Sequence, residues 1–323
     1  MTIHPHIARW GLAAAGAIAL GLGPAAAQDY PSRAVDVIVP FNPGGGADAS
    51  QRTFNKYAEP IIGQPMVIVN KPGAGGTAGW AEMVRAEPDG YTMSIVTPPF
   101  NIIPALARPQ QTGYTLDQFT YVCIYAVVPD VLLVREDSEF ETLDDLIAYA
   151  KENPGQIKAA NTGTLGADFM TTLLIENATG MEFTQIPFTG GSEALQGILA
   201  GTTDAMVASS LFAVAQEGSL RTLAIAAPER DPNLPDVPTF TELGYDVVSE
   251  RYRVFGGPPG LSEEIVDYWA DVCQQVTSNE DFQAAMNELG QPPAYRGPEE
   301  AKASIDAMQE RMQSLVDTYD LAE

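Results

Sequence analysis

The sequence predicts an α/β protein in which two lobes, each a mainly parallel sheet flanked by helices, face each other across a cleft. Short apolar runs alternate with helical patterns, which is typical of parallel sheets. The alternation occurs in two separate series, and in both the loops after the strands are rich in Gly, Ser and Thr. Because ligands bind beyond the carboxyl ends of parallel strands, these loops are the candidate binding site.

The first strand, loop and helix define the pattern. The apolar run 37–39 ends at a loop of prolines and glycines, 40–46, and a helix begins at once. The chain repeats this arrangement with the strand 66–69 and the loop 70–79. Each loop presents backbone N–H groups at a helix N-terminus, where the helix dipole favours an anion. We therefore expect one anion to be held from two sides.

The remaining elements follow in order. A third strand, 91–96, leads into Thr97, and two apolar runs, 121–128 and 131–134, are divided by Pro129. The second series is predicted as the strands 157–160, 183–186, 204–208 and 221–227, with helices after the first two. A strand over 247–255 and helices over 263–277, 281–289 and 298–321 complete the chain. The runs 121–128 and 247–255 are the candidate connections between lobes.

The first 27 residues predict a secretory leader. A weakly basic start precedes an apolar stretch, 11–22, which is too short to span a bilayer, and Ala25, Ala26 and Ala27 fit a cleavage site. Cleavage after Ala27 would leave an exported, soluble protein without direct membrane insertion. The formal net charge of −25 argues against nucleic acid and anionic membrane surfaces as partners.

Cysteine and histidine limit the chemistry. The chain has two cysteines, Cys123 and Cys273, which an oxidising compartment would allow to pair, although buried free thiols are the commoner state on apolar faces. Both histidines, His4 and His6, lie in the leader. The mature chain therefore lacks Ser–His and Cys–His pairs and the usual zinc ligands. We expect no enzyme activity, no cofactor and no metal.

An ordered set of motifs resembles the substrate-binding proteins of tripartite tricarboxylate transporters, the Bug-type periplasmic receptors. The resemblance covers essentially all of 28–323, and its motifs lie, in order, at 30–33, 39–48, 70–76, 88–92, 143–146, 190–194, 201–204 and 234–239. It implies a two-lobe periplasmic binding protein fold of type II, with a leader over 1–27, lobe one over 28–126 and 252–323, and lobe two over 127–251. It also implies that the protein is a monomeric receptor whose partners are a small organic carboxylate and the large and small membrane transporter subunits.

In this family two glycine loops of lobe one hold a carboxylate, largely through backbone N–H groups, and loops of lobe two complete the site. Carried over to this chain, and with Thr97 added from its place after a strand, the candidate ligand-binding residues are Phe41, Gly45, Gly46, Asp48, Gly75, Gly76, Thr77, Thr97, Thr162, Gly163, Thr164, Ala167, Asp168, Thr189, Gly190, Asp204 and Ser209. No arginine stands in these loops, so backbone dipoles and hydroxyls are expected to bind the anion.

The chain departs from the family pattern in lobe two. Where relatives often carry a Ser-Ser-Asp-His tract, this chain has Gly166, Ala167, Asp168 and Phe169. Fewer hydroxyls and more apolar surface suit a ligand less charged than citrate, such as an aliphatic or aromatic mono- or dicarboxylate. The sequence does not identify the ligand.

Other interpretations stay open. Asp48 and Asp168 each stand in the first turn of a helix, where the helix dipole alone favours an acid, and Asp204 could make a structural hydrogen bond. A receptor for a signalling system without transport fits the same sequence. An exported enzyme is the third alternative, although the glycine loop at 44–46 does not have the GxGxxG spacing of a dinucleotide site.

Overall fold

The computed structural model describes residues 1–2, 30–161, 165–188 and 190–322. The apolar stretch of the predicted leader and its cleavage site after Ala27 lie outside the described residues. Within the described part, no helix combines the length and the apolar character that crossing a bilayer requires.

The first half of the fold is a parallel three-stranded core. It contains β1 (Val35–Val39), α1 (Gly46–Ile62), β2 (Met66–Asn70), a short 3₁₀ turn (Ala74–Gly76), α2 (Thr77–Met83) and β3 (Thr92–Val96). Both β2 and β3 pair in parallel with β1. Helix α1 packs because Phe54, Ala58 and Ile62 recur on one face and are buried, whereas Ile61, which the apolar periodicity also places on this face, is exposed. Two short helices, α3 (Ile102–Ala107) and α4 (Pro109–Thr112), and a 3₁₀ turn (Leu116–Gln118) follow.

The strand β4 (Thr120–Arg135) joins the two halves. Its first part pairs antiparallel with β9 (Glu250–Gly257), and from Asp130 onward it pairs with β7 and β8. The sequence predicted two runs broken at Pro129, but the structure has one strand. Proline lacks the backbone N–H that a ladder needs, and here Pro129 stands at the point where the strand changes partners.

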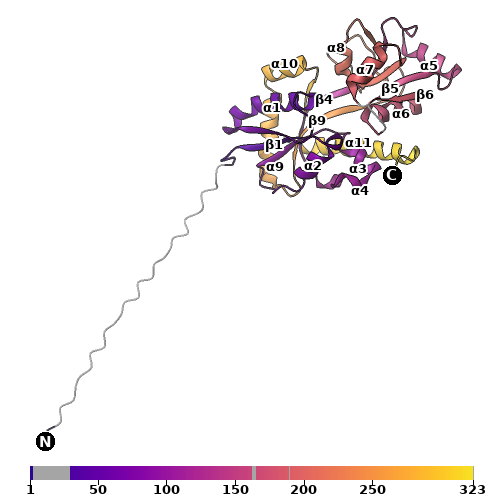
Figure 1. The fold of residues 1–323 in the computed structure, drawn as a ribbon. Helices are drawn as coiled ribbons and strands as arrows, with labels where there is room; N and C mark the ends of the chain where they lie inside the picture. The colour runs from indigo at the N-terminus through magenta and orange to yellow at the C-terminus, as the bar shows by residue number, and fades with distance from the viewer. Residues whose placement is uncertain (3–29, 162–164, 189, 323) are drawn as a thin grey trace.

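The second half repeats the parallel core. It contains α5 (Leu143–Glu152), β5 (Ile157–Asn161), α6 (Ala167–Thr179), β6 (Phe183–Pro187), α7 (Gly191–Leu199), β7 (Ala205–Ser209), α8 (Ser210–Ala215) and β8 (Leu220–Ala226). Strands β6 and β7 both pair in parallel with β5. Figure 1 shows α5–α8 gathered at one end of the molecule, and β4 and β9 running between that end and the half that holds β1.

The sheet is continuous and mixed rather than two separate parallel sheets. Its order is β2-β1-β3-β9-β4-β7-β5-β6, and β8 and β10 (Pro293–Arg296) also pair with β4. The expected parallel strands are present in each half. The antiparallel pairs arise because β4 and β9 cross between the halves in opposite directions.

The C-terminal segment returns to the first half as α9 (Glu263–Thr277), α10 (Glu280–Glu288), β10 and α11 (Pro298–Thr318). On α9 the buried face includes Cys273, which forms a disulfide with Cys123 of β4. Of the two alternatives that the sequence left open, the structure has the paired one. The bond ties the last part of the chain to the central strand across 150 residues of sequence.

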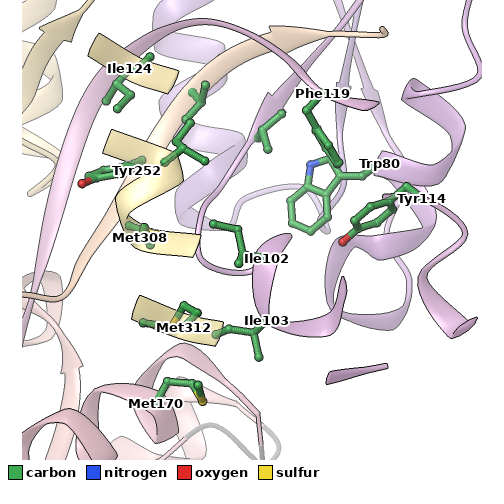
Figure 2. Packing of buried hydrophobic residues seen from close by; sticks show 14 of the residues in the cluster. Trp80, Ile102, Ile103, Tyr114, Phe119, Ile124, Met170, Tyr252, Met308 and Met312 are labelled. Atoms are coloured by element: carbon green, nitrogen blue, oxygen red, sulfur yellow. The ribbon is translucent and has the colours of Figure 1, made fainter. Parts of the chain in front are cut away.

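One apolar cluster reaches across both halves. Figure 2 shows Met170 of α6 close to Met312 of α11 and Ile103 of α3, and all three are buried in the same cluster. Helix α11 therefore contacts both halves.

Candidate functional site

A cavity of about 250 Å³ lies where the two halves meet. Its lining comes from the first glycine loop, the ends of β3 and β7, and one face of β9. The residues are Phe41, Gly45, Gly46, Ala47, Thr97, Phe100, Ser209, Leu211, Arg251 and Arg253. The sequence analysis named Phe41, Gly45, Gly46, Thr97 and Ser209 as candidate binding residues, and the fold brings these five together.

The first glycine loop is held in shape by Asp48. The buried Asp48 carboxylate accepts hydrogen bonds from the Gly44 backbone N–H at 2.8 Å, from Asn70 Nδ2 at 2.9 Å and from Arg52 Nε at 2.9 Å. Burial alone would raise the pKa of Asp48, but these hydrogen bonds outweigh it and hold the pKa below its usual value. Asp48 does not line the cavity, so the structure assigns it to the support of the loop.

The second glycine loop packs around the rings of Trp80 and Phe41. Gly75, Gly76 and Thr77 do not line the cavity. A Cβ at Gly76 would lie 2.8 Å from the Trp80 ring, and φ there is +104°, so only glycine fits without strain. The Phe41 ring packs edge-on against Trp80, with the ring centroids 5.8 Å apart. This loop therefore fixes Phe41, which does face the cavity.

Two hydroxyl groups lie at strand ends on opposite sides of the cavity. Thr97 directly follows β3 and Ser209 ends β7, and both side chains are buried. Thr97 Oγ1 has no hydrogen-bond partner among the described residues. Because a buried hydroxyl without a partner costs about 1–3 kcal/mol, Thr97 is a ready donor or acceptor for a bound molecule.

Two arginines that the sequence analysis did not name project from β9 into the cavity. Arg251 is neutralised within the protein. Its Nε donates to Asp130 Oδ1 at 2.6 Å, and its Nη2 donates to Asp168. Burial on its own would lower the pKa of Arg251, but the two carboxylates reverse that effect and raise it. Asp168, a candidate ligand residue, is thereby used in an internal ion pair.

Arg253 has a different environment. It is 6% exposed, and its Nε donates to Gln291 Oε1 at 2.6 Å. Within the described residues no carboxylate lies within ion-pair distance of its guanidinium. Burial, together with the nearby charge of Arg251, lowers the pKa of Arg253 to about 10. The guanidinium remains charged at neutral pH.

Other candidates lie away from the cavity. Ala167 and Gly190 stand at the starts of α6 and α7 and do not line it. Asp204 is exposed before β7, and its carboxylate accepts from the Lys158 backbone N–H at 2.9 Å. The lining residue Ser209 is at the other end of that strand, about 16 Å away by strand geometry, and Asp204 makes the structural hydrogen bond that was its alternative. Thr162, Gly163, Thr164 and Thr189 lie outside the described residues.

The sequence analysis considered only the loops, in which no arginine stands, and so did not name the two arginines of β9 that line the cavity. Side chains alternate along a strand, so Arg251 and Arg253 share one face of β9, while Glu250 and Tyr252 share the other. The Glu-Arg-Tyr-Arg tract is the signal that the sequence offered, since it places charges in a strand predicted to pass between the lobes.

A second cavity of about 230 Å³ lies on the other face of β9. Glu250, Tyr252, Arg296 and Arg311 line it, together with apolar residues of α11, and none of the candidate residues does. In the described part of the chain, no group of three or more His, Cys, Asp or Glu side chains is arranged to hold a metal ion. The first cavity is therefore the candidate ligand site.

The chain is similar to known receptors along most of its length. The profile of the tripartite tricarboxylate transporter family receptor, TctC, matches residues 51–321. A UPF0065 protein in the gbd 5′ region of Cupriavidus necator is 31% identical over 90% of this chain and 89% of its own length. The protein BugT of Bordetella pertussis is 28% identical over 87% of this chain and 88% of its own length.

Solved structures of similar fold belong to the same kind of protein. A TctC solute-binding protein from Polaromonas, without ligand, has a TM-score of 0.78 at 26% identity, over 90% of this chain and 99% of that one. MatC from Rhodopseudomonas palustris, with bound malate, has a TM-score of 0.74 at 28% identity, over 89% and 100%. Another R. palustris protein, solved with adipate, has a TM-score of 0.77 at 26% identity, over 90% and 98%.

These matches confirm the predicted fold class and the resemblance read from the motifs. The family profile covers most of the chain, and the shared fold extends over about nine-tenths of it. The chain belongs to the tripartite tricarboxylate transporter receptor family, whose members are periplasmic solute-binding proteins.

Proposed function

We propose that this protein is a periplasmic receptor that captures a small organic carboxylate between its two halves and delivers it to a tripartite tricarboxylate-type membrane transporter. The observation that carries the proposal is the cavity at the boundary of the halves, which combines the N-terminus of α1 with Arg253. Both favour an anion. Two structural neighbours were solved with the dicarboxylates malate and adipate, which supports this ligand class.

The walls of the cavity favour an acid with apolar carbon atoms. Phe41 and Phe100 form one side, with ring centroids 6.5 Å apart, and Leu211 faces them from the second half. Such a surface stabilises methylene or aromatic groups and offers few partners to a third carboxylate. We therefore favour an aliphatic or aromatic mono- or dicarboxylate over citrate.

Capture would proceed by hinge closure. We propose that lobe one comprises 28–126 and 252–323 and that lobe two comprises 127–251. The boundary between them crosses β4 and β9 close to the point where β4 changes partners. Gly45, Gly46 and Thr97 come from one side of that boundary and Ser209 and Leu211 from the other. A ligand that touches both sides binds the closed state better than the open state, and this difference drives closure.

We further propose that the leader is removed after Ala27, that the receptor acts as a monomer without cofactor, and that it catalyses no reaction. The chain carries both of its histidines in the leader, so the mature protein lacks the commonest general base. Its family relatives are solute-binding receptors.

The ligand class is tested by thermal shift and calorimetry on the mature protein with malate, adipate, terephthalate, citrate and amino acids. A ligand that binds only the folded state raises the melting temperature. We expect adipate or terephthalate to raise it more than citrate does. A flat response to every carboxylate, from folded protein free of copurified ligand, would contradict the proposed function, and tight citrate binding would contradict the apolar preference.

Delivery needs a separate test. Uptake of the labelled ligand should be lost when the receptor gene is deleted, and it should return only when both the receptor and the membrane subunits are supplied. Normal uptake without the receptor would favour the alternative of a signalling receptor.

A further inference from the structure

The charges around β9 are unevenly balanced. Arg251 contacts two buried carboxylates, Asp130 and Asp168, so its own charge is compensated within the protein. Asp130 is further satisfied by hydrogen bonds from Thr171 Oγ1 at 2.7 Å and Ser249 Oγ at 3.0 Å. Arg253, two residues along the same face, has no such partner among the described residues. Its buried positive charge faces the cavity without a neutralising neighbour.

The position of Arg253 adds to this imbalance. A Cβ on Gly46 would lie 3.8 Å from Arg253 Nη2 and 3.7 Å from Gln291 Nε2, so both side chains stand beside the first residue of α1. The N-terminus of a helix carries a partial positive charge. The buried guanidinium and the positive end of the helix thus lie side by side, an arrangement that an anion between them would stabilise.

The arrangement is held in place by Gln291. Its Oε1 accepts from Arg253 Nε, and its Nε2 donates to the Gly46 carbonyl oxygen at 2.9 Å. This buried amide therefore fixes the guanidinium and the glycine loop relative to each other. Its Oε1 engages Nε of the arginine, and Arg253 Nη2 is the atom that lies beside the glycine loop.

A second observation points independently to a ligand. Thr97 is 1% exposed, lines the same cavity, and its Oγ1 has no hydrogen-bond partner among the described residues. Buried hydroxyls in folded proteins are normally hydrogen-bonded. A carboxylate oxygen held by Arg253 would be an acceptor within a cavity of this size.

We propose that Arg253 is the charged anchor of the site and binds one carboxylate of the ligand, with Gln291 as its positioning residue. This inference rests on the proposed function and sharpens it, because the charge of the site then comes from one side chain rather than from backbone dipoles alone. One unbalanced cation matches one carboxylate. The rest of the ligand lies against Phe41, Phe100 and Leu211, so the site takes acids with a single carboxylate at this end and an apolar body.

The test compares the wild type with Arg253→Gln and Arg253→Lys. The probes are adipate and hexanoate, with hexanamide as an uncharged counterpart and acetate as a minimal carboxylate. The matched control is Arg296→Gln, which removes an arginine from the second cavity on the opposite face of β9. Calorimetry gives affinities, and thermal melting of each ligand-free variant shows that it is folded.

We expect Arg253→Gln to weaken binding of the carboxylate that binds the wild type by about tenfold or more, because a hydrogen bond to a charged group contributes about 1.5–3 kcal/mol. Arg253→Lys should retain part of the affinity, Arg296→Gln all of it, and hexanamide should bind the wild type and Arg253→Gln alike. Unchanged carboxylate affinity in folded Arg253→Gln would overturn the anchor and leave the proposed function standing.

Failure of the proposed function gives a different pattern. If no carboxylate of the full panel, hexanoate included, binds the wild type, that function is contradicted, and acetate then decides the inference alone. An acetate-dependent rise in the melting temperature of the wild type that is absent from Arg253→Gln supports the anchor. Equal responses of the two proteins to acetate, including no response from either, overturn it.

Discussion

Two arginines on one face of β9 differ in what surrounds them. Arg251 lies between Asp130 and Asp168, whereas Arg253, two residues further on, contacts an uncharged amide, Gln291. Both are largely buried and both line the candidate site. The difference shows that a lining residue is not automatically a binding residue. The charge balance of its neighbours decides whether it stabilises the fold or remains available to a ligand.

The two environments have opposite consequences for stability. Removing one member of a buried ion pair leaves the other charge uncompensated, which is strongly destabilising. Removing a buried charge that has no partner relieves a desolvation cost instead. The comparison therefore predicts effects of opposite sign for the same substitution at two neighbouring positions.

The largest effect is expected for Arg251→Gln. Because it leaves two buried carboxylates without their cation, we expect a loss of about 3–5 kcal/mol in the free energy of unfolding, measured by urea denaturation. The double variant Arg251→Gln/Asp168→Asn should lose less. Lys302→Gln, which removes an exposed ion pair with Asp306, is the control and should change stability by less than about 1 kcal/mol. A loss of less than about 1 kcal/mol for Arg251→Gln would contradict the proposed difference between the two arginines.

Arg253→Gln should raise the free energy of unfolding rather than lower it. A pKa lowered from 12.5 to about 10 corresponds to a cost of about 3 kcal/mol for burying the charged guanidinium. We expect the ligand-free variant to be about 1–3 kcal/mol more stable than the wild type at neutral pH. Since the depressed pKa means that the unfolded chain binds the proton more tightly, the advantage should shrink as the pH rises above about 10.

Asp48→Asn is expected to cost about 1.5 kcal/mol, because the carboxylate holds both glycine loops through charged hydrogen bonds. The folded-state pKa of Asp48 is lowered, so this stabilisation is complete at neutral pH and is lost as the pH falls below 3.8 and through the folded value. Denaturation of wild type and variant from pH 7 to pH 3 checks this. A difference in stability that grows toward acid would contradict the assignment.

The smallest effect on stability is expected for Thr97→Val. The hydroxyl makes no hydrogen bond within the described residues, so its loss should not lower the free energy of unfolding and should raise it by about 1 kcal/mol as the cost of burying the hydroxyl is relieved. Carboxylate affinity should nevertheless fall by about two- to tenfold in calorimetry, as expected for one neutral hydrogen bond. Full affinity would remove Thr97 from the site and leave Arg253 as the polar group that matters.

Much of the fold could be predicted from the sequence, because strand and helix patterns are local. The parallel strands of each half, α1 and α9 follow directly from apolar periodicity and from glycine or proline at their ends. The short helices α3, α4 and α8 and the strand β10 were not predicted, since four to six residues give too few periods to distinguish a pattern. The disulfide depends on the approach of β4 and α9, which the pattern does not determine.

The candidate site was predictable only where its residues follow strands. The first loop, Thr97 and Ser209 obey the rule that ligands lie at carboxyl ends of parallel strands. Arg251 and Arg253 lie inside an antiparallel strand and reach the site only because β9 crosses between the halves. Their different roles depend on Asp130, Asp168 and Gln291, which are far from them in sequence.

The most direct test is to unfold Arg251→Gln and Arg253→Gln with urea, side by side, in buffer without carboxylates. The account predicts that the first is several kcal/mol less stable than the wild type and that the second is as stable or more stable. A similar loss of stability in both variants would show that Arg253 is a structural residue like its neighbour, and it would contradict the central claim that its charge is kept for the ligand.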